Sequence, residues 1–183
     1  FKRGYKNVIN ESKRLNDAGT VSPLAIETSG HAALRENYFL DDGAYLMTKI
    51  IIKMAQLGKS GKHLEDLIAM LEEPLESREF RMPITCEEFK PYGEHVIETV
   101  ASYAEAQSAW QIAPDNHEGI RVAFDKEHGD GWFLLRLSVH DPIMPLNIES
   151  DTMGGVMMIA HQLYEALKGC ASPDITPLKK FIE

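Results

Sequence analysis

Ile26-Glu27-Thr28-Ser29-Gly30-His31 is the most informative stretch of this chain, and Asp41-Asp42-Gly43 follows it closely. The run places a carboxylate, two hydroxyls, a glycine and an imidazole directly after a short apolar strand, Leu24–Ile26. A Glu side chain accepts two hydrogen bonds, and a Ser hydroxyl both donates and accepts, so such a loop can hold adjacent hydroxyl groups. The imidazole can transfer a proton near neutral pH. The structural alternative is a helix-capping acid, a turn serine and a solvated histidine.

A second polar segment, Arg136-Leu137-Ser138-Val139-His140-Asp141-Pro142, ends an apolar strand that begins at Trp132. A guanidinium at a strand end can hold a phosphate through a two-pronged contact, and a serine hydroxyl and backbone N–H groups in the following turn can complete an anion site. The alternative here is a surface arginine at the end of a strand.

The two segments resemble the α-D-phosphohexomutases, the phosphomannomutase/phosphoglucomutase family. Ile26 to Tyr45 is similar to the family's sugar-specificity loop, which reads Glu-x-Ser-Gly-His and then Asp-Asp-Gly. Gly119-Ile120-Arg121-Val122, Gly131-Trp132 and the Arg136 segment are similar to its C-terminal phosphate loop, usually Arg-x-Ser-(Gly/Asn)-Thr-x-Pro. Val139 and His140 depart from that pattern. The two matches follow the family's order and together span most of the chain.

The resemblance implies roles for individual residues. His31 is the candidate for proton transfer. The implied sugar-binding residues are Glu27, Ser29 and Lys6, and the implied phosphate-binding residues are Arg136, Ser138, Val139 and His140. Asp41 and Asp42 look like a metal pair, but capping of the following helix is favoured, so no metal is assigned to this chain.

The resemblance also implies a fragment, because the chain begins at Phe1 and contains neither the family's phosphoserine loop nor its Asp-x-Asp-x-Asp magnesium loop. The parent enzyme would be an intramolecular phosphotransferase, an isomerase that interconverts 1-phospho and 6-phospho hexoses with Mg²⁺ and a hexose 1,6-bisphosphate. The fragment alone would be inactive, and its partners would be a hexose phosphate and the upstream domains. The alternatives are a non-catalytic phosphosugar-binding or regulatory module, and a structural domain that no longer binds ligand.

Composition narrows the classes of partner. The net charge of −9 over 183 residues argues against nucleic acid and against an anionic membrane surface, since both require a basic face. One or two well-placed cations still suffice for a single phosphate. No apolar run approaches the roughly 18–20 residues of a membrane span. Cys86 and Cys170 are far apart in the sequence, which favours free thiols in a reducing cytoplasm.

The expected organisation is two domains joined at 74–78, a charged stretch with a proline. Residues 1–74 would be the later part of the family's third domain, an α/β/α layer, and 79–183 a C-terminal α+β domain like the TATA-box-binding protein, an antiparallel sheet with two helices on one face. We expect helix 44–57 to be buried, because it is apolar nearly all round. The other expected elements are helices 6–16, 63–71, 92–110 and 152–168, and strands 24–26, 80–86, 120–124, 132–136 and 146–149.

Overall fold

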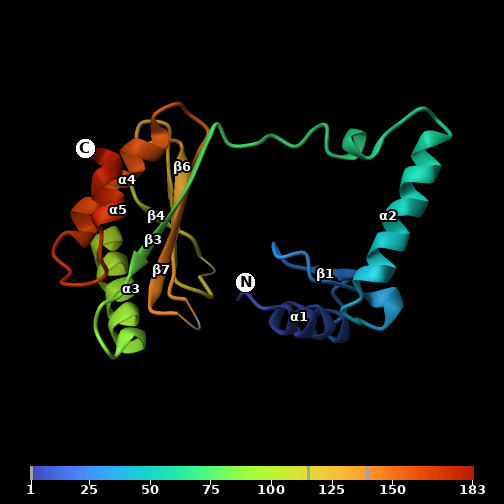
Figure 1. Cartoon of the computed structure of the whole chain (residues 1–183), viewed down its shortest axis with the longest axis horizontal. Coiled ribbons are helices and arrows are strands. Elements are labelled where there is room, and N and C mark those ends of the chain that lie inside the picture. The colour runs from blue at the N-terminus through green and yellow to red at the C-terminus, as the bar shows by residue number, and fades with distance from the viewer. Residues whose placement is uncertain (1, 115, 139–140) are drawn as a thin grey trace. The chain divides into compact units, whose positions relative to one another are not determined.

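The computed structural model describes residues 2–114, 116–138 and 141–183. The chain divides into two compact units, Phe1–Glu72 and Glu73–Glu183 (Figure 1). The predicted junction at 74–78 lies just after this division, and the identities given to the two domains stay predictions. Among the described residues, none of the helices is both long enough and apolar enough to span a membrane.

Unit 1 (Phe1–Glu72) is built on a small hairpin. Strands β1 (Leu24–Ile26) and β2 (Ala32–Leu34) pair antiparallel, and helix α1 (Tyr5–Asp17) packs against β1. Ser12 on α1 is buried, and its hydroxyl lies 2.7 Å from the hydroxyl of Ser22 in the loop before β1. This polar contact ties α1 to the strand that leads into the Glu27 loop. A short 3₁₀ turn, η1 (Arg35–Asn37), and helix α2 (Gly43–Gly58) complete the region.

Two expectations for unit 1 are wrong. Helix α2 is not buried: Met47, Ile51 and Met54 are each 50% exposed or more, and Leu57 is the buried residue of the helix. The reason is that the described residues of this unit cover the helix mainly through β2 and the 3₁₀ turn η2 (Leu64–Leu67). The expected helix 63–71 is reduced to η2, because short helices depend on tertiary packing for stability, and Ile68 and Leu71 are exposed.

Unit 2 (Glu73–Glu183) contains a five-stranded antiparallel sheet with the strand order β3-β7-β6-β5-β4. The strands are β3 (Glu76–Pro83), β4 (Gln111–Ile112), β5 (Ile120–Phe124), β6 (Gly131–Leu135) and β7 (Ile143–Ser150). The predicted α+β class with an antiparallel sheet is therefore confirmed. Strand β3 begins earlier than predicted, since apolar alternation starts only at Phe80, while backbone pairing with β7 already starts at Glu76.

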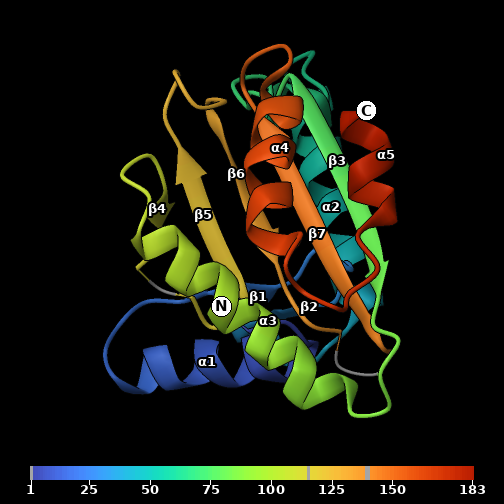
Figure 2. The same ribbon diagram turned by 90° about the vertical axis from the view of Figure 1, so that its left-hand side faces the viewer.

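Three helices cover one face of this sheet: α3 (Phe89–Glu105), α4 (Gly155–Leu167) and α5 (Thr176–Ile182). Figure 2 shows all three in front of the strands. The prediction of two helices on one face is thus incomplete, because α5 was not predicted. Alternate residues of the strands point to the helices and form the core with them, including Met82, Val122, Phe133, Leu135, Met144, Leu146, Ile148, Val96, Val100, Ile159 and Leu163. Residues of the opposite sheet face are more exposed.

Candidate functional site

The Glu27–His31 segment is the connection of the β1–β2 hairpin. The backbone N–H of Glu27 donates to the carbonyl of His31 at 3.1 Å, and that of Gly30 donates to the carbonyl of Glu27 at 2.9 Å. Gly30 has φ of +90°, a conformation that L side chains rarely adopt, so a glycine is required here. The loop therefore has a defined shape on a rigid hairpin, although its residues lie near the surface.

The Glu27 carboxylate is held by two donors from its own unit. The backbone N–H of Gly4 donates to Oε2 at 2.9 Å, and the hydroxyl of Ser29 donates to Oε1. The Ser29 hydrogen bond is the main reason why the pKa of Glu27 lies below its ordinary value, and the Gly4 N–H and the charges of His31 and Arg3 lower it further. Glu27 is thus an ionised hydrogen-bond acceptor with a fixed orientation.

His31 is oriented by two neighbours. Its Nδ1 lies 2.7 Å from Oδ2 of Asp41, which is the residue before the N-cap of α2. Its ring stacks on Tyr5 with centroids 5.0 Å apart and an angle of 25° between the planes. The imidazole is half exposed, so a ligand can reach it.

We call this cluster the loop site. It consists of Gly4, Tyr5, Glu27, Ser29, His31 and Asp41. The predicted residues Glu27, Ser29 and His31 do lie in one hairpin loop. Lys6, also predicted, is exposed on the first turn of α1, with Nζ 5.8 Å from the ring centroid of Tyr5. The sequence reasoning did not single out Tyr5. It considered Asp41 only as a possible metal ligand or helix cap.

The Asp41-Asp42 pair divides into two different roles. Asp42 is the N-cap of α2, where its Oδ1 accepts a hydrogen bond of 3.0 Å from the N–H of Tyr45, as the sequence predicts. Asp41 faces His31 instead. Within the part of the chain that the structure describes, no group of three or more His, Cys, Asp and Glu side chains could hold a metal ion. The Asp42 carboxylate caps α2 and the Asp41 carboxylate contacts His31, so the two are not arranged as a shared metal site.

In unit 2, Arg136 follows β6 and lies at the base of the turn that leads to β7. Its backbone N–H donates to the carbonyl of Pro145 at 3.1 Å, which extends the strand pairing by one residue. Its guanidinium Nη1 lies 3.8 Å from Oε1 of Glu118, and both side chains are largely buried. The pKa of Glu79 lies below its ordinary value, mainly because the Arg81 side chain donates a hydrogen bond to its carboxylate. The positive charge of Arg136 lowers this pKa further. Glu118 is therefore a neighbour of the candidate phosphate ligand.

Ser138 is bonded within its own unit on both its backbone and its side chain. The N–H of Ser138 donates to the carbonyl of Ile143 at 3.0 Å, so this N–H is not directed at a ligand. The Ser138 hydroxyl accepts a long hydrogen bond of 3.4 Å from the N–H of Asp141. Val139 and His140, the remaining predicted phosphate-binding residues, lie outside the described residues. Among the described residues, Arg136 and the Ser138 hydroxyl are thus the side-chain groups of the predicted phosphate site.

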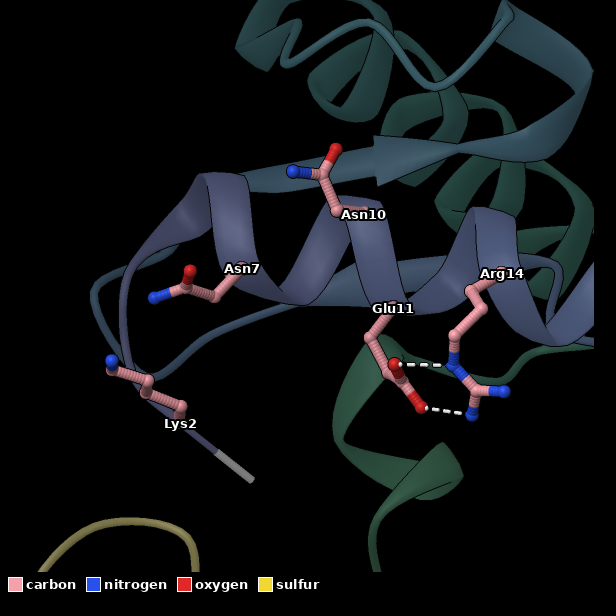
Figure 3. A pocket seen from close by; sticks show the side chains of 5 residues that line it. All are labelled: Lys2, Asn7, Asn10, Glu11 and Arg14. Atoms are coloured by element: carbon pink, nitrogen blue, oxygen red, sulfur yellow. Dashed lines mark hydrogen bonds and ion pairs between the residues drawn. The ribbon is translucent and has the colours of Figure 1, made fainter.

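A separate shallow pocket of about 250 Å³ runs along the polar face of α1 and is shown in Figure 3. It is lined by Lys2, Asn7, Asn10, Glu11 and Arg14. Arg14 makes a two-pronged pair with Glu11 one turn away, at 2.8 and 2.6 Å. Surface pairs of this kind on one helix are common and contribute little to stability. The loop site, with its oriented histidine and carboxylate, is the stronger candidate.

Comparisons with known proteins agree with the motifs. No family model matches the chain. A phosphoglucomutase of Neisseria gonorrhoeae is 29% identical over 140 residues, 76% of this chain and 28% of that protein. A phosphomannomutase/phosphoglucomutase of Pseudomonas syringae pv. tomato is 27% identical over 176 residues, 96% of this chain and 34% of that protein.

The crystal structure of a phosphoglucomutase/phosphomannomutase family protein from Burkholderia thailandensis has the same fold. The TM-score is 0.66 at 23% sequence identity, covering 97% of this chain and 33% of that one. The chain is thus similar to phosphoglucomutases and phosphomannomutases, the family that its motifs resemble. It spans 28% and 34% of the length of the two curated relatives named above.

Proposed function

We propose that this chain supplies the sugar-binding and phosphate-binding part of a phosphohexomutase that interconverts the 1- and 6-phosphates of a hexose. The observation that carries the proposal is the ionised Glu27 carboxylate, held by Gly4 and Ser29 in the same hairpin loop as an oriented imidazole. Its oxygens accept hydrogen bonds only, which suits the adjacent hydroxyl groups of a sugar ring. The names of the curated relatives support hexose phosphates as substrates.

In this proposal each predicted residue has one task. Glu27 and Ser29 hold the hydroxyls of the sugar ring, and Lys6 lies near enough to Tyr5 to reach the same ligand. His31 takes the proton from the hydroxyl that becomes phosphorylated. Arg136, with Ser138, Val139 and His140, holds the phosphate that is not transferred, because a guanidinium matches phosphate oxygens in a two-pronged contact. Positioning and electrostatics supply most of the rate of phosphoryl transfer.

The phosphoryl donor and the metal would lie in other parts of the enzyme. The family resemblance implies a phosphoserine, Mg²⁺ at that serine and a hexose 1,6-bisphosphate intermediate. The sequence of this chain holds no Asp-x-Asp-x-Asp motif for such a metal. The purified chain should therefore show no mutase turnover above background with glucose 1-phosphate and glucose 1,6-bisphosphate in a coupled assay. Turnover by the chain alone would contradict the proposal that the phosphoryl donor and the metal lie in other parts of the enzyme.

Binding is the direct test of the proposal. Glucose 1-phosphate titrated into the ¹⁵N-labelled chain should shift the backbone amide signals of residues 27–31. The variant Ser29→Ala should weaken that response, and Thr28→Ala, an exposed hydroxyl in the same loop, is the matched control. Amide shifts that are absent in the wild type, or unchanged by Ser29→Ala, would count against the sugar-binding role.

The alternative is a phosphosugar-binding or regulatory module without catalysis. Such a module would need only the loop site and Arg136. The two functions differ at His31. In a mutase, His31→Gln should reduce turnover of the complete enzyme far more than hexose phosphate affinity, whereas a binding module has no turnover for the substitution to reduce.

A further inference from the structure

We infer that Asp41 is the positioning residue for His31: its carboxylate holds the proton on Nδ1 and so leaves Nε2 as the nitrogen that exchanges protons with the ligand. The inference rests on the proposed function for the identity of the ligand. It goes beyond that function because it assigns a role to Asp41, and it follows from the juxtaposition of two side chains that the hairpin and α2 bring together.

The hydrogen bond decides which nitrogen carries the proton. Nδ1 of His31 lies 2.7 Å from Oδ2 of Asp41, a normal length for a charge-assisted contact. An ionised carboxylate has no proton to donate, so Nδ1 must be the donor. In a neutral imidazole the other nitrogen, Nε2, then carries the lone pair. This arrangement corresponds to the use of a carboxylate to fix the tautomer of a catalytic histidine in other enzymes.

The backbone around Asp41 keeps the carboxylate in place. Asp41 forms an isolated antiparallel bridge with Ala33 of β2, the strand that His31 leads into. The next residue, Asp42, is fixed as the N-cap of α2. The Asp41 side chain is about a quarter exposed. The bridge to Ala33 is made by the backbone of Asp41 and does not involve its side chain. Replacing the side chain should therefore leave the hairpin intact.

Tyr5 constrains the ring in a second direction. A hydrogen bond at Nδ1 fixes one edge of the imidazole but allows it to rotate about that contact. The Tyr5 ring lies against the imidazole face at a centroid distance of 5.0 Å, which limits that rotation. Tyr5 begins α1 directly after Gly4, whose N–H is bonded to Glu27. The first turn of α1 thus supports both functional side chains of the loop.

The first experiment reads the tautomer by long-range ¹H–¹⁵N NMR of the ¹⁵N-labelled chain at about pH 8.5, about two units above the ordinary histidine pKa. A His31→Gln variant identifies the His31 signals among the seven histidines. We expect Nδ1 to be protonated and Nε2 unprotonated in the wild type. In Asp41→Ala both nitrogens should show averaged shifts. Asp42→Asn removes the same charge one residue away and keeps an N-cap residue, so it should match the wild type.

The second experiment separates positioning from ligand binding in the proposed enzyme. Asp41→Ala should lower kcat for glucose 1-phosphate by about 10- to 100-fold, the loss typical of removing a group that orients a metal-binding histidine through its other nitrogen, and change KM by no more than about twofold. Asp41→Asn, which keeps the shape but can donate an amide N–H to Nδ1 and so favour the wrong tautomer, should lower kcat at least as much. It also serves as the second variant if thermal melting shows that Asp41→Ala does not fold.

Three results would overturn the inference: protonated Nε2 in the wild type, an unchanged tautomer in Asp41→Ala, or a rise in KM with unchanged kcat. Failure of the proposed function looks different. If the chain binds no glucose 1-phosphate while the tautomer depends on Asp41 as expected, the sugar assignment fails and the role of Asp41 in orienting His31 holds.

Discussion

Arg136 and Glu118 face each other in unit 2, with the guanidinium Nη1 3.8 Å from the carboxylate Oε1. This distance exceeds that of a good hydrogen bond, so the pair is an electrostatic attraction and not a tight two-pronged contact. Each side chain is 17% exposed, which confines the guanidinium to the end of strand β6. Arg136 is thus positioned at the end of β6 before any ligand arrives.

Arg136→Ala in the proposed enzyme should lower kcat/KM by roughly 10- to 150-fold, since a charge-assisted contact to phosphate contributes about 1.5–3 kcal/mol. The loss should be the same for glucose and mannose phosphates, because both carry the phosphate. Arg81→Ala is the control: Arg81 lies on strand β3 of the same sheet and pairs with Glu79, with Nε 2.8 Å from Oε1. An unchanged kcat/KM in Arg136→Ala would remove the phosphate-binding assignment.

Glu27→Gln should change the ratio of activities on glucose and mannose phosphates, because the proposed contact is with the sugar ring. The amide keeps the size of the side chain but replaces one acceptor oxygen with a donor. It can no longer accept from both Gly4 and Ser29. The measurement is kcat/KM for both sugars in wild type and variant. Equal losses on both sugars would mean that Glu27 does not discriminate between them.

Gly119→Ala should destabilise unit 2 by about 2 kcal/mol or more, through backbone conformation and overlap together. Gly119 has φ of +72°, and an added Cβ would lie 2.1 Å from the carbonyl oxygen of Leu135 and 2.8 Å from Cα of Arg136. Gly169→Ala is the control, since a Cβ there meets nothing within 4 Å. Urea unfolding of both variants measures the difference, and equal midpoints would show that the β6 backbone moves aside at little cost.

The acid side of the stability curve should depend on Ser29. The pKa of Glu27 is lowered in the folded chain, chiefly by the Ser29 hydroxyl, so the ionised carboxylate adds stability above its unfolded pKa. This contribution is lost as the pH falls through the lower, folded value. Ser29→Ala should raise the folded pKa of Glu27 towards its ordinary value, so that the contribution becomes smaller and its loss is complete at a higher pH. Carboxyl ¹³C titration of both proteins tests this, and an unchanged Glu27 midpoint would contradict it.

Limited proteolysis should first cut within 71–75, because this stretch has no regular structure. The charged residues that follow belong to strand β3 and should be cut later. Leu71 and Leu75 are 68% and 62% exposed, whereas Glu76 and Glu79 already pair with β7. A Glu-specific protease should therefore cleave after Glu72 or Glu73 and yield two fragments that resist further digestion. First cleavage within 131–150 would count against the two-unit organisation.

Much of the fold follows from the sequence because its signals are local. Strand β5 alternates around Arg121, β6 is apolar from Trp132 to Leu135, and the turn residues Gly129-Asp130-Gly131 between them predict their hairpin correctly. Strands β2 and β4 were not predicted, because three and two residues are too short for a period to be visible. Helix α5, of seven residues, owes its place to packing such as the contact between Phe181 and Phe80, which no local pattern contains.

In the candidate site, too, the sequence predicts local features but not contacts between residues that are distant along the chain. The composition of residues 27–31 predicts a loop that can hold hydroxyl groups, and the structure adds how its carboxylate is oriented. The contact of Asp41 with His31 depends on a strand bridge at Ala33, so the pair Asp41-Asp42 could only be read locally, as a helix cap. That reading is correct for Asp42 alone.

The pairing of β3 with β7 has a consequence for how unit 2 forms. The first strand of this unit hydrogen-bonds along its whole length to the last, from Glu76 opposite Ser150 to Pro83 opposite Ile143. The Glu76 carboxylate also accepts N–H bonds of 2.9 and 3.0 Å from Gly154 and Val156 at the start of α4. During synthesis on the ribosome, β3 therefore emerges long before β7 and α4, and it cannot form these hydrogen bonds until both have been made. Such non-local closure slows folding, so unit 2 should reach its native state only after β7 and α4 have been synthesised.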